Sequence, residues 1–360
     1  MSRYPIFMTV LSLSTIALSG EANAASYVLV AETDEGCKLY LDGTSLVSSG
    51  CNVHIENGDG STDTTNGVGN LIVGYSEDNR LDRSGSHNIV VGDYHSYSSY
   101  GGLVAGFSNT VTGAYASVTG GAANEATNAY DSVSGGFRNT AYGSYSSVSG
   151  GSYNYAGGQN SSVSGGNYNS ANGSYASVSG GYDNLASGSY AWVSGGRYNE
   201  AGDRYDSVSG GSYNTVSAGA GSISGGENNT VTGGSGSVSG GRYNEASGDY
   251  ASVTGGLFNE AASSYSSVSG GSSNTAGGNS YTSVSGGVGN LALGQYASVS
   301  GGYDNVANGD YTSVSGGYEN TARGNAATVN GGYSNVSDGT YTAILGGNNR
   351  YLSATYATSW

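Results

Sequence analysis

The chain has 360 residues, of which 66 are glycine and 32 are tyrosine, with one proline, 10% charged residues and a formal net charge of −16. Leucine, isoleucine and phenylalanine are too scarce for a conventional hydrophobic core, yet the chain lacks the dense charge and proline of a disordered protein. Because an acidic surface repels phosphate groups, the composition excludes nucleic acid and anionic lipid as partners.

Residues 1–24 are interpreted as a signal peptide. Arg3 precedes the apolar run IFMTVLSLSTIALSG, and Ala22 and Ala24 form a small-x-small cleavage site. A retained membrane helix is the alternative, but the run is short for a bilayer span. No later stretch is apolar for long enough to cross a membrane as a helix. We therefore expect a secreted or cell-surface-associated protein without an integral membrane anchor.

Residues 25–65 differ from the rest of the chain and are interpreted as an N-terminal cap. An extracellular location would allow Cys37 and Cys51 to form one disulfide, with two free thiols as the alternative. The apolar residues of this segment suggest a hairpin or a first coil: Tyr40, Leu41, Val53 and Ile55.

A regular repeat occupies residues 106–347, after irregular first coils at 66–105, and residues 348–360 are interpreted as a C-terminal cap. The repeat follows the 15-residue rule G-G-x-x-N-x-A-x-G-x-Y-x-S-V-S for 16 periods, with one extra residue before Val284. Such a period is typical of a solenoid. Short Val/Ser/Thr/Tyr segments between glycine pairs indicate strands and turns, so each period predicts one coil of two short strands. The fold class is therefore an all-β parallel β-roll, or β-helix.

Two columns of this repeat are predicted to form the interior. Valine points inward from one strand and a small residue from the other, which makes a thin core. The asparagine column predicts a ladder of side-chain amides that bond from coil to coil. The core column includes Val133, Val148, Val163, Val178, Val193 and Val208, and the ladder column includes Asn139, Asn154, Asn169, Asn184 and Asn199.

Other columns are predicted to face solvent. Trp192 stands just before an inward valine, where a thin core has no room for an indole, so we expect its position to face outward. Two residues before the valine, strict alternation would point inward, but Asp131 and Asp206 occur there and suggest a solvated corner. The candidate contact surface comprises Tyr175, Tyr190, Trp192 and Tyr205. The tyrosines belong to a column that recurs along the repeat. In the alternative interpretation this column is a stacked aromatic stripe that only shields a corner of the coils.

Phrases such as SVSGGYDNVANGDYTSVSGG resemble the head repeats of trimeric autotransporter adhesins, the YadA-like left-handed parallel β-roll, over roughly Asn70 to Gly347. This resemblance implies a left-handed roll, three rolls packed about an axis, and binding of an extracellular protein or glycan. The chain departs from the family in its 15-residue period, in Ser-Gly-Gly where the heads prefer Ala-Ile-Gly, and in lacking the family's stalk and anchor motifs.

No pattern of catalytic chemistry is present, so we expect no enzyme, no metal and no cofactor. Asp93 and His95 are a weak metal pair, and Asn57 to Asp63 has the spacing of half a calcium loop without its bidentate glutamate. The function indicated is a structural or adhesive repeat protein with multivalent contacts. A self-assembling extracellular fibril and an ice-binding solenoid stay open as alternatives. The second is disfavoured because the residues that flank the valines are overwhelmingly serine rather than threonine.

Overall fold

The computed structural model describes residues 27–32, 36–75 and 77–359, which belong to two compact units, Met1–His54 and Ile55–Trp360. The signal peptide predicted for residues 1–24 lies outside the described residues. The part of the chain that the structure describes contains no helix that could span a bilayer.

The first unit is a three-stranded antiparallel sheet of β1 (Tyr27–Glu32), β2 (Lys38–Asp42) and β3 (Ser45–Ser49), in the order β1-β2-β3. Asp42 pairs with Ser45 across a two-residue turn in which Gly43 has a φ of 57°, as tight hairpins favour. Cys37 and Cys51, just outside the two ends of this hairpin, form a disulfide. Val53 and Ile55 lie outside the strands and are exposed, so they take no part in the hairpin.

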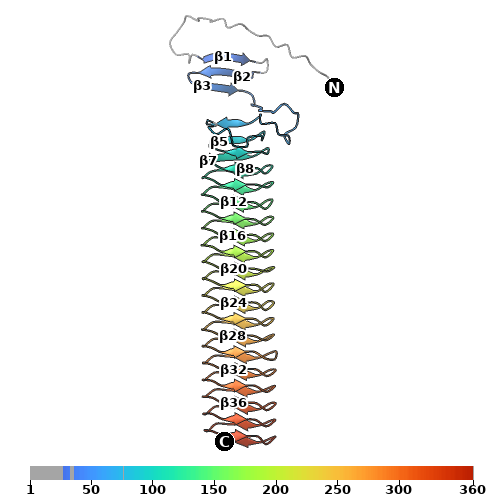
Figure 1. The fold of residues 1–360 in the computed structure, drawn as a ribbon, viewed down its shortest axis with the longest axis vertical. Helices are drawn as coiled ribbons and strands as arrows, with labels where there is room; N and C mark the ends of the chain where they lie inside the picture. Colours follow the sequence, from blue (N-terminus) through green and yellow to red (C-terminus); the bar gives the residue numbers. More distant parts are fainter. Residues whose placement is uncertain (1–26, 33–35, 76, 360) are drawn as a thin grey trace. The chain divides into compact units, whose positions relative to one another are not determined.

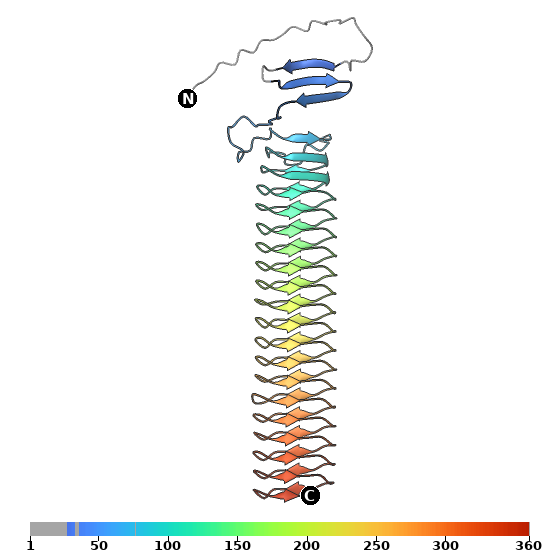
Figure 2. The same cartoon turned by 180° about the vertical axis from the view of Figure 1, so that it is seen from behind.

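The second unit is a stack of coils, each adding one strand to each of two parallel sheets (Figure 1 and, from behind, Figure 2). The first sheet contains β4 Leu71–Val73, β5 Ile89–Asp93, β7 Leu103–Phe107, β9 Ser117–Val118, β11 Ser132–Val133, β13 Ser147–Val148, β15 Ser162–Val163, β17 Ser177–Val178, β19 Trp192–Val193, β21 Ser207–Val208, β23 Ser222–Ile223, β25 Ser237–Val238, β27 Ser252–Val253, β29 Ser267–Val268, β31 Ser283–Val284, β33 Ser298–Val299, β35 Ser313–Val314, β37 Thr328–Val329, β39 Ala343–Ile344 and β41 Thr358–Ser359.

The second sheet is built in the same way from the other strand of each coil. It contains β6 Ser96–Tyr97, β8 Thr110–Val111, β10 Glu125–Ala126, β12 Thr140–Ala141, β14 Tyr155–Ala156, β16 Ser170–Ala171, β18 Leu185–Ala186, β20 Glu200–Ala201, β22 Thr215–Val216, β24 Thr230–Val231, β26 Glu245–Ala246, β28 Glu260–Ala261, β30 Thr275–Ala276, β32 Leu291–Ala292, β34 Val306–Ala307, β36 Thr321–Ala322, β38 Val336–Ser337 and β40 Tyr351–Leu352.

Strands of successive coils pair in parallel and in register. Val178 pairs with Val193 one period later, and this pattern confirms an all-β parallel solenoid of about 15 residues per turn. The extra residue before Val284 lies in a corner, because Ser267 still pairs with Ser283. Residues 351–359 form one further coil, since β40 and β41 continue the two sheets.

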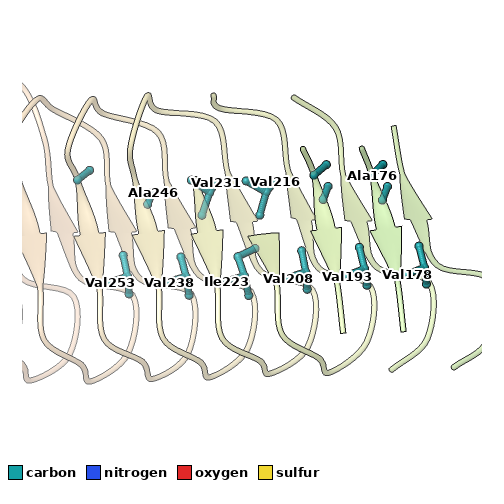
Figure 3. Packing of buried hydrophobic residues seen from close by; sticks show 14 of the residues in the cluster. Ala176, Val178, Val193, Val208, Val216, Ile223, Val231, Val238, Ala246 and Val253 are labelled. Atoms are coloured by element: carbon teal, nitrogen blue, oxygen red, sulfur yellow. The ribbon is translucent and has the colours of Figure 1, made fainter. Parts of the chain in front are cut away.

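Two rows of small apolar side chains, one from each sheet, make up most of the thin core (Figure 3). Val178, Val193 and their counterparts point inward from the first sheet, and the Ala or Val of most second-sheet strands faces them. All of these side chains are almost completely inaccessible to solvent. Because adjacent residues of each strand face opposite ways, Trp192 points outward and is 42% exposed.

The core has a third column, and here the expectation of a solvated corner was wrong. The residue two positions before each valine is buried, as Ala176 and Ala191 show, and Asp131 and Asp206 are both 0% exposed. Asp131 Oδ1 accepts hydrogen bonds from the backbone N–H and the hydroxyl of Ser146, each at 2.9 Å. These bonds satisfy the carboxylate, which is why an acid can occupy a core position.

The asparagine column forms a continuous internal ladder. Asn184 donates its backbone N–H to Asn169 Oδ1 at 3.1 Å, and its own Nδ2 donates to the carbonyl oxygens of Gly180 and Gly196 at 3.0 Å each. The same bonds recur, with small variations, along a column whose side chains are at most 1% exposed: Asn139, Asn154, Asn169, Asn184 and Asn199 among them. The ladder therefore joins each coil to its neighbours through the interior.

Candidate interaction surface

The first tyrosine ladder lies at the corner that precedes each first-sheet strand. Neighbouring rings stack with centroids 4.8 to 5.3 Å apart, for example 4.9 Å between Tyr175 and Tyr190 and 5.2 Å between Tyr190 and Tyr205. Its members are Tyr115, Tyr130, Tyr145, Tyr175, Tyr190, Tyr205, Tyr250, Tyr265, Tyr281, Tyr296, Tyr311 and Tyr341, and their exposed fractions run from 43% to 58%. Stacking covers the ring faces, so ring edges and hydroxyl groups face solvent.

A second tyrosine ladder occupies the opposite corner, after the glycine pair of each coil. Its rings come from either of the two residues that follow the pair, and Tyr153 and Tyr168 stack at 4.8 Å. Contacts run without a break through Phe137, Tyr153, Tyr168, Tyr182, Tyr198 and Tyr213, and resume at Tyr243–Phe258 and at Tyr303–Tyr318–Tyr333. Sequence reasoning missed this ladder because it alternates between two positions, although both are visibly rich in tyrosine.

The first ladder places its aromatic residues in an unusual backbone conformation, and so does the second of the two positions that supply the second ladder. Rings at the other position, such as Tyr182 and Tyr303, do not have a positive φ. Tyr175 has a φ of 60° and Tyr198 a φ of 55°, and among the described residues more than half of the non-glycine residues with positive φ are tyrosines. Glycine, asparagine and aspartate occupy this left-handed region most readily, and Asn160 does so in the first ladder. Tyrosine therefore occupies these corners against the local backbone preference, which indicates that the ring itself has a role.

Arginine side chains lie on several of these rings. The Arg204 guanidinium is 4.6 Å from the Tyr205 ring centroid and 5.8 Å from that of Tyr190. On the second ladder, Arg242 stands 5.0 Å from Tyr243 and Arg138 stands 5.1 Å from the Phe137 ring. Tyrosine, tryptophan and arginine are the residues that most often dominate binding energy at protein interfaces.

The first sheet carries a second type of surface. Serine stands on either side of most inward valines, so two rows of hydroxyl groups run along the stack. Some hydroxyls bond along a row, as between Ser162 and Ser177 at 3.2 Å. Trp192 interrupts one row between Ser177 and Ser207, two residues after Tyr190 of the first ladder.

Acidic neighbours favour the protonated, hydrogen-bond-donating form of two exposed tyrosines, Tyr318 and Tyr351. The nearby carboxylate of Glu319 raises the pKa of Tyr318, and a hydrogen bond from the Tyr351 hydroxyl to Asp338 raises the pKa of Tyr351. Both effects act in the same direction because a negative charge disfavours the phenolate.

The weak metal candidates serve the fold instead. His95 is 2% exposed, its Nδ1 accepts the Asn109 N–H at 3.2 Å and its Nε2 lies 3.0 Å from the Val91 carbonyl oxygen. Both ring nitrogens are thus engaged by backbone groups, and His95 begins the asparagine ladder. In the loop from Asn57 to Asp63, Asn57 Oδ1 accepts the N–H of Asp59. No group of three or more His, Cys, Asp or Glu side chains among the described residues is arranged to hold a metal ion.

Neither the protein-family models nor the curated proteins include a match to this chain. Its class is therefore defined by the structure: a repeat β-solenoid whose corners carry exposed, stacked tyrosine ladders.

Proposed function

We propose that this protein is a secreted or cell-surface adhesive rod that binds extracellular protein or glycan surfaces through its two tyrosine ladders. The observation that carries the proposal is the presence of tyrosine at corner positions whose left-handed backbone favours other residues. A purely structural corner would be satisfied by asparagine or glycine.

The ladders suit multivalent binding. Each ring offers an apolar edge and one hydroxyl group, a combination typical of contact surfaces that must work in water. Because the coils repeat at about 4.8 Å, many identical weak contacts can form on one extended partner, and their combined strength exceeds that of any single contact.

Two features support an extracellular location. The Cys37–Cys51 disulfide is typical of an oxidising compartment, and residues 1–24 have the pattern of a signal peptide. The resemblance to trimeric adhesin heads adds left-handed winding and a homotrimer to the proposal. Sedimentation equilibrium of the mature chain tests the trimer, and a measured mass equal to that of a single chain would contradict the homotrimer.

The adhesive function is tested by replacing five consecutive rings of the first ladder, Tyr250, Tyr265, Tyr281, Tyr296 and Tyr311, with asparagine. Asparagine accepts the same backbone conformation, as Asn160 shows, so the fold should be retained. Beads coated with the wild-type protein are expected to adhere to surfaces coated with collagen, fibronectin or mucin, and the variant beads to adhere several-fold less.

The matched control replaces five outward serines in the same coils, Ser252, Ser267, Ser283, Ser298 and Ser313, with alanine, and should adhere like the wild type. Wild-type beads that adhere no better than albumin-coated beads would overturn the proposal. So would full adhesion by the asparagine variant.

A further inference from the structure

The regular part of the solenoid contains one coil of 16 residues, and a surface hollow lies at its corner. Asn274 and Asn290 are the consecutive ladder residues of this coil, and the extra residue falls in the segment Gly277–Ser280. The hollow has a volume of about 400 Å³ and spans three coils, with lining residues from Ser247 to Ser280. This volume is in the range of sites that hold a small molecule.

The hollow forms because the extra residue alters the backbone of the corner, whereas the strands on either side keep their pairing. Gly278 takes a φ of 75°, and the N–H of Asn279 is held by the carbonyl oxygen of Leu293 at 2.9 Å. In the coil before it, Ser263 occupies a column that is usually glycine, and its Oγ lies 3.0 Å from Thr282 Oγ1 in the interior. Hydrogen bonds thus hold both walls in place.

The lining is rich in polar groups. Hydroxyl groups come from Ser247, Ser264 and Ser280, an amide from Asn279, and a carboxylate from Asp249. Asp249 Oδ1 accepts the N–H of Gly234 at 2.9 Å, which anchors the carboxylate at the rim. Hydroxyls, an amide and one fixed carboxylate are the groups that hydrogen-bond the vicinal hydroxyls of a sugar.

We propose that this hollow binds one neutral hexose unit of an extracellular glycan. The inference rests on the proposed adhesive function and names a ligand class for one place on the rod. Lysine and arginine are absent from the lining, and Asp249 is acidic, so a sulfated or carboxylated sugar would be repelled. A calcium ion requires six to eight oxygen ligands with several charges, and the lining supplies a single carboxylate.

The test is a titration of the full mature chain, followed by NMR or calorimetry, with glucose, galactose, mannose and N-acetylglucosamine as probes. Glucuronic acid and calcium chloride serve as the competing ligand classes. At least one neutral sugar is expected to bind at millimolar concentration, and glucuronic acid and calcium to bind at least tenfold more weakly or not at all. Binding of glucuronic acid or calcium in preference to every neutral sugar would overturn the proposal.

Two variants locate the site. Deletion of Gly278 restores a 15-residue coil, and Ser264→Leu fills the hollow from its wall, so each should weaken sugar binding at least tenfold while the circular dichroism spectrum is retained. Because the two variants change the hollow in different ways, misfolding of one leaves the other as the test. If either variant folds and binds the sugar as tightly as the wild type does, the sugar site is not in this hollow.

The two proposals fail separately. The asparagine variant of the first ladder should lose adhesion to protein-coated surfaces and keep its sugar titration. Absence of binding by every neutral sugar at tens of millimolar would overturn the hexose site alone, provided that wild-type beads still adhere. Wild-type beads that fail to adhere although the wild-type protein still binds a neutral sugar would instead contradict the ladder function alone.

Discussion

The Oδ2 atom of Asp131 accepts a hydrogen bond from the backbone N–H of Asn128 at 2.8 Å. Asn128 stands in a column that is glycine in most coils, because a Cβ there would overlap the carbonyl group of the next coil, as at Gly143 and Gly188. In a glycine coil the N–H bonds to that next coil, as Gly143 does to Ala156 at 3.2 Å. At Asn128, where glycine is replaced, the buried carboxylate takes over as the acceptor.

The same pairing occurs once more. Asp203 replaces the glycine, and Asp206 Oδ2 accepts its N–H at 2.8 Å. In the following coil Ala218 also replaces the glycine, and its N–H donates to the same carboxylate at 3.2 Å. Asp206 therefore supports two successive irregular corners. Asp131 and Asp206 thus accept the N–H groups of non-glycine residues at this corner, where most coils have glycine.

The pairing predicts a coupled effect on stability. Asp131→Ala leaves the N–H groups of Asn128 and Ser146 without their acceptor and should lower the local free energy of opening by about 1–3 kcal/mol. Adding Asn128→Gly recreates the corner found at Gly173–Ala176 and should recover most of that loss. Hydrogen exchange of residues 125–150 measures both variants, and an additive double variant would contradict the coupling.

A pH dependence follows from the same residue. Burial raises the pKa of Asp131 above its ordinary value, although its hydrogen bonds act in the opposite direction. The folded coil therefore holds the proton more tightly than the unfolded chain does. The contribution of Asp131 to stability is greatest below the pKa that this residue has in the unfolded chain. It is lost as the pH rises through the pKa of Asp131 in the folded protein.

Hydrogen exchange of these coils in the acid range, compared between the wild type and Asp131→Asn, isolates this contribution. As the pH rises from about 4, the ordinary pKa of aspartate, the opening free energy of the wild type should fall relative to that of the variant. A difference that is constant over the acid range would contradict a raised pKa.

The glycine pair at the second corner predicts opposite outcomes for adjacent residues. Gly166 has a φ of 86°, and a Cβ there would overlap the Gly181 carbonyl and the Asn169 amide, whereas a Cβ at Gly165 would meet open space. Gly166→Ala should cost about 2 kcal/mol or more. Gly165→Ala should change stability by less than about 0.5 kcal/mol. Chemical unfolding of both variants measures the contrast, and equal effects would refute it.

The asparagine ladder predicts a large local loss for Asn184→Ala. The substitution removes the acceptor of the Asn199 N–H and the donor to two glycine carbonyl groups in the interior. Each buried group left without a partner costs about 1–3 kcal/mol, so protection of coils 169–199 should fall by at least about 3 kcal/mol. Protection equal to that of the wild type would show that these bonds do not stabilise the stack.

The disulfide should stabilise the first unit alone. Cys37 and Cys51 are 14 residues apart, and closing a loop of this size is worth about 3 kcal/mol. Changing both to serine should therefore expose residues 27–49 to limited proteolysis and leave residues 106–347 resistant. Cleavage within the coils at the same protease dose would contradict independent stability of the two units.

Much of the solenoid can be predicted from the sequence because its period is strict. The strict period places Val178 above Val193, and side-chain alternation along a strand then points Trp192 away from the core. The unbroken asparagine column indicates an internal ladder for a similar reason, since a polar residue repeated between apolar ones needs partners in the adjacent coils.

The sequence suggested a stacked tyrosine stripe at one corner, but the other features of the corners escaped prediction and were decided by the tertiary structure. Alternation holds only in extended backbone, and each corner contains residues with positive φ, such as Tyr175 and Asp183, that redirect the chain. Whether Asp131 faces water or the core depends on that redirection and on the N–H groups that the turn presents to it. The sequence by itself determined the coil, its period and its inner columns, because these follow from local repetition. Only the folded stack brought the second ladder, the buried acids and the hollow beside Asp249 into place, because these depend on contacts between one coil and the next.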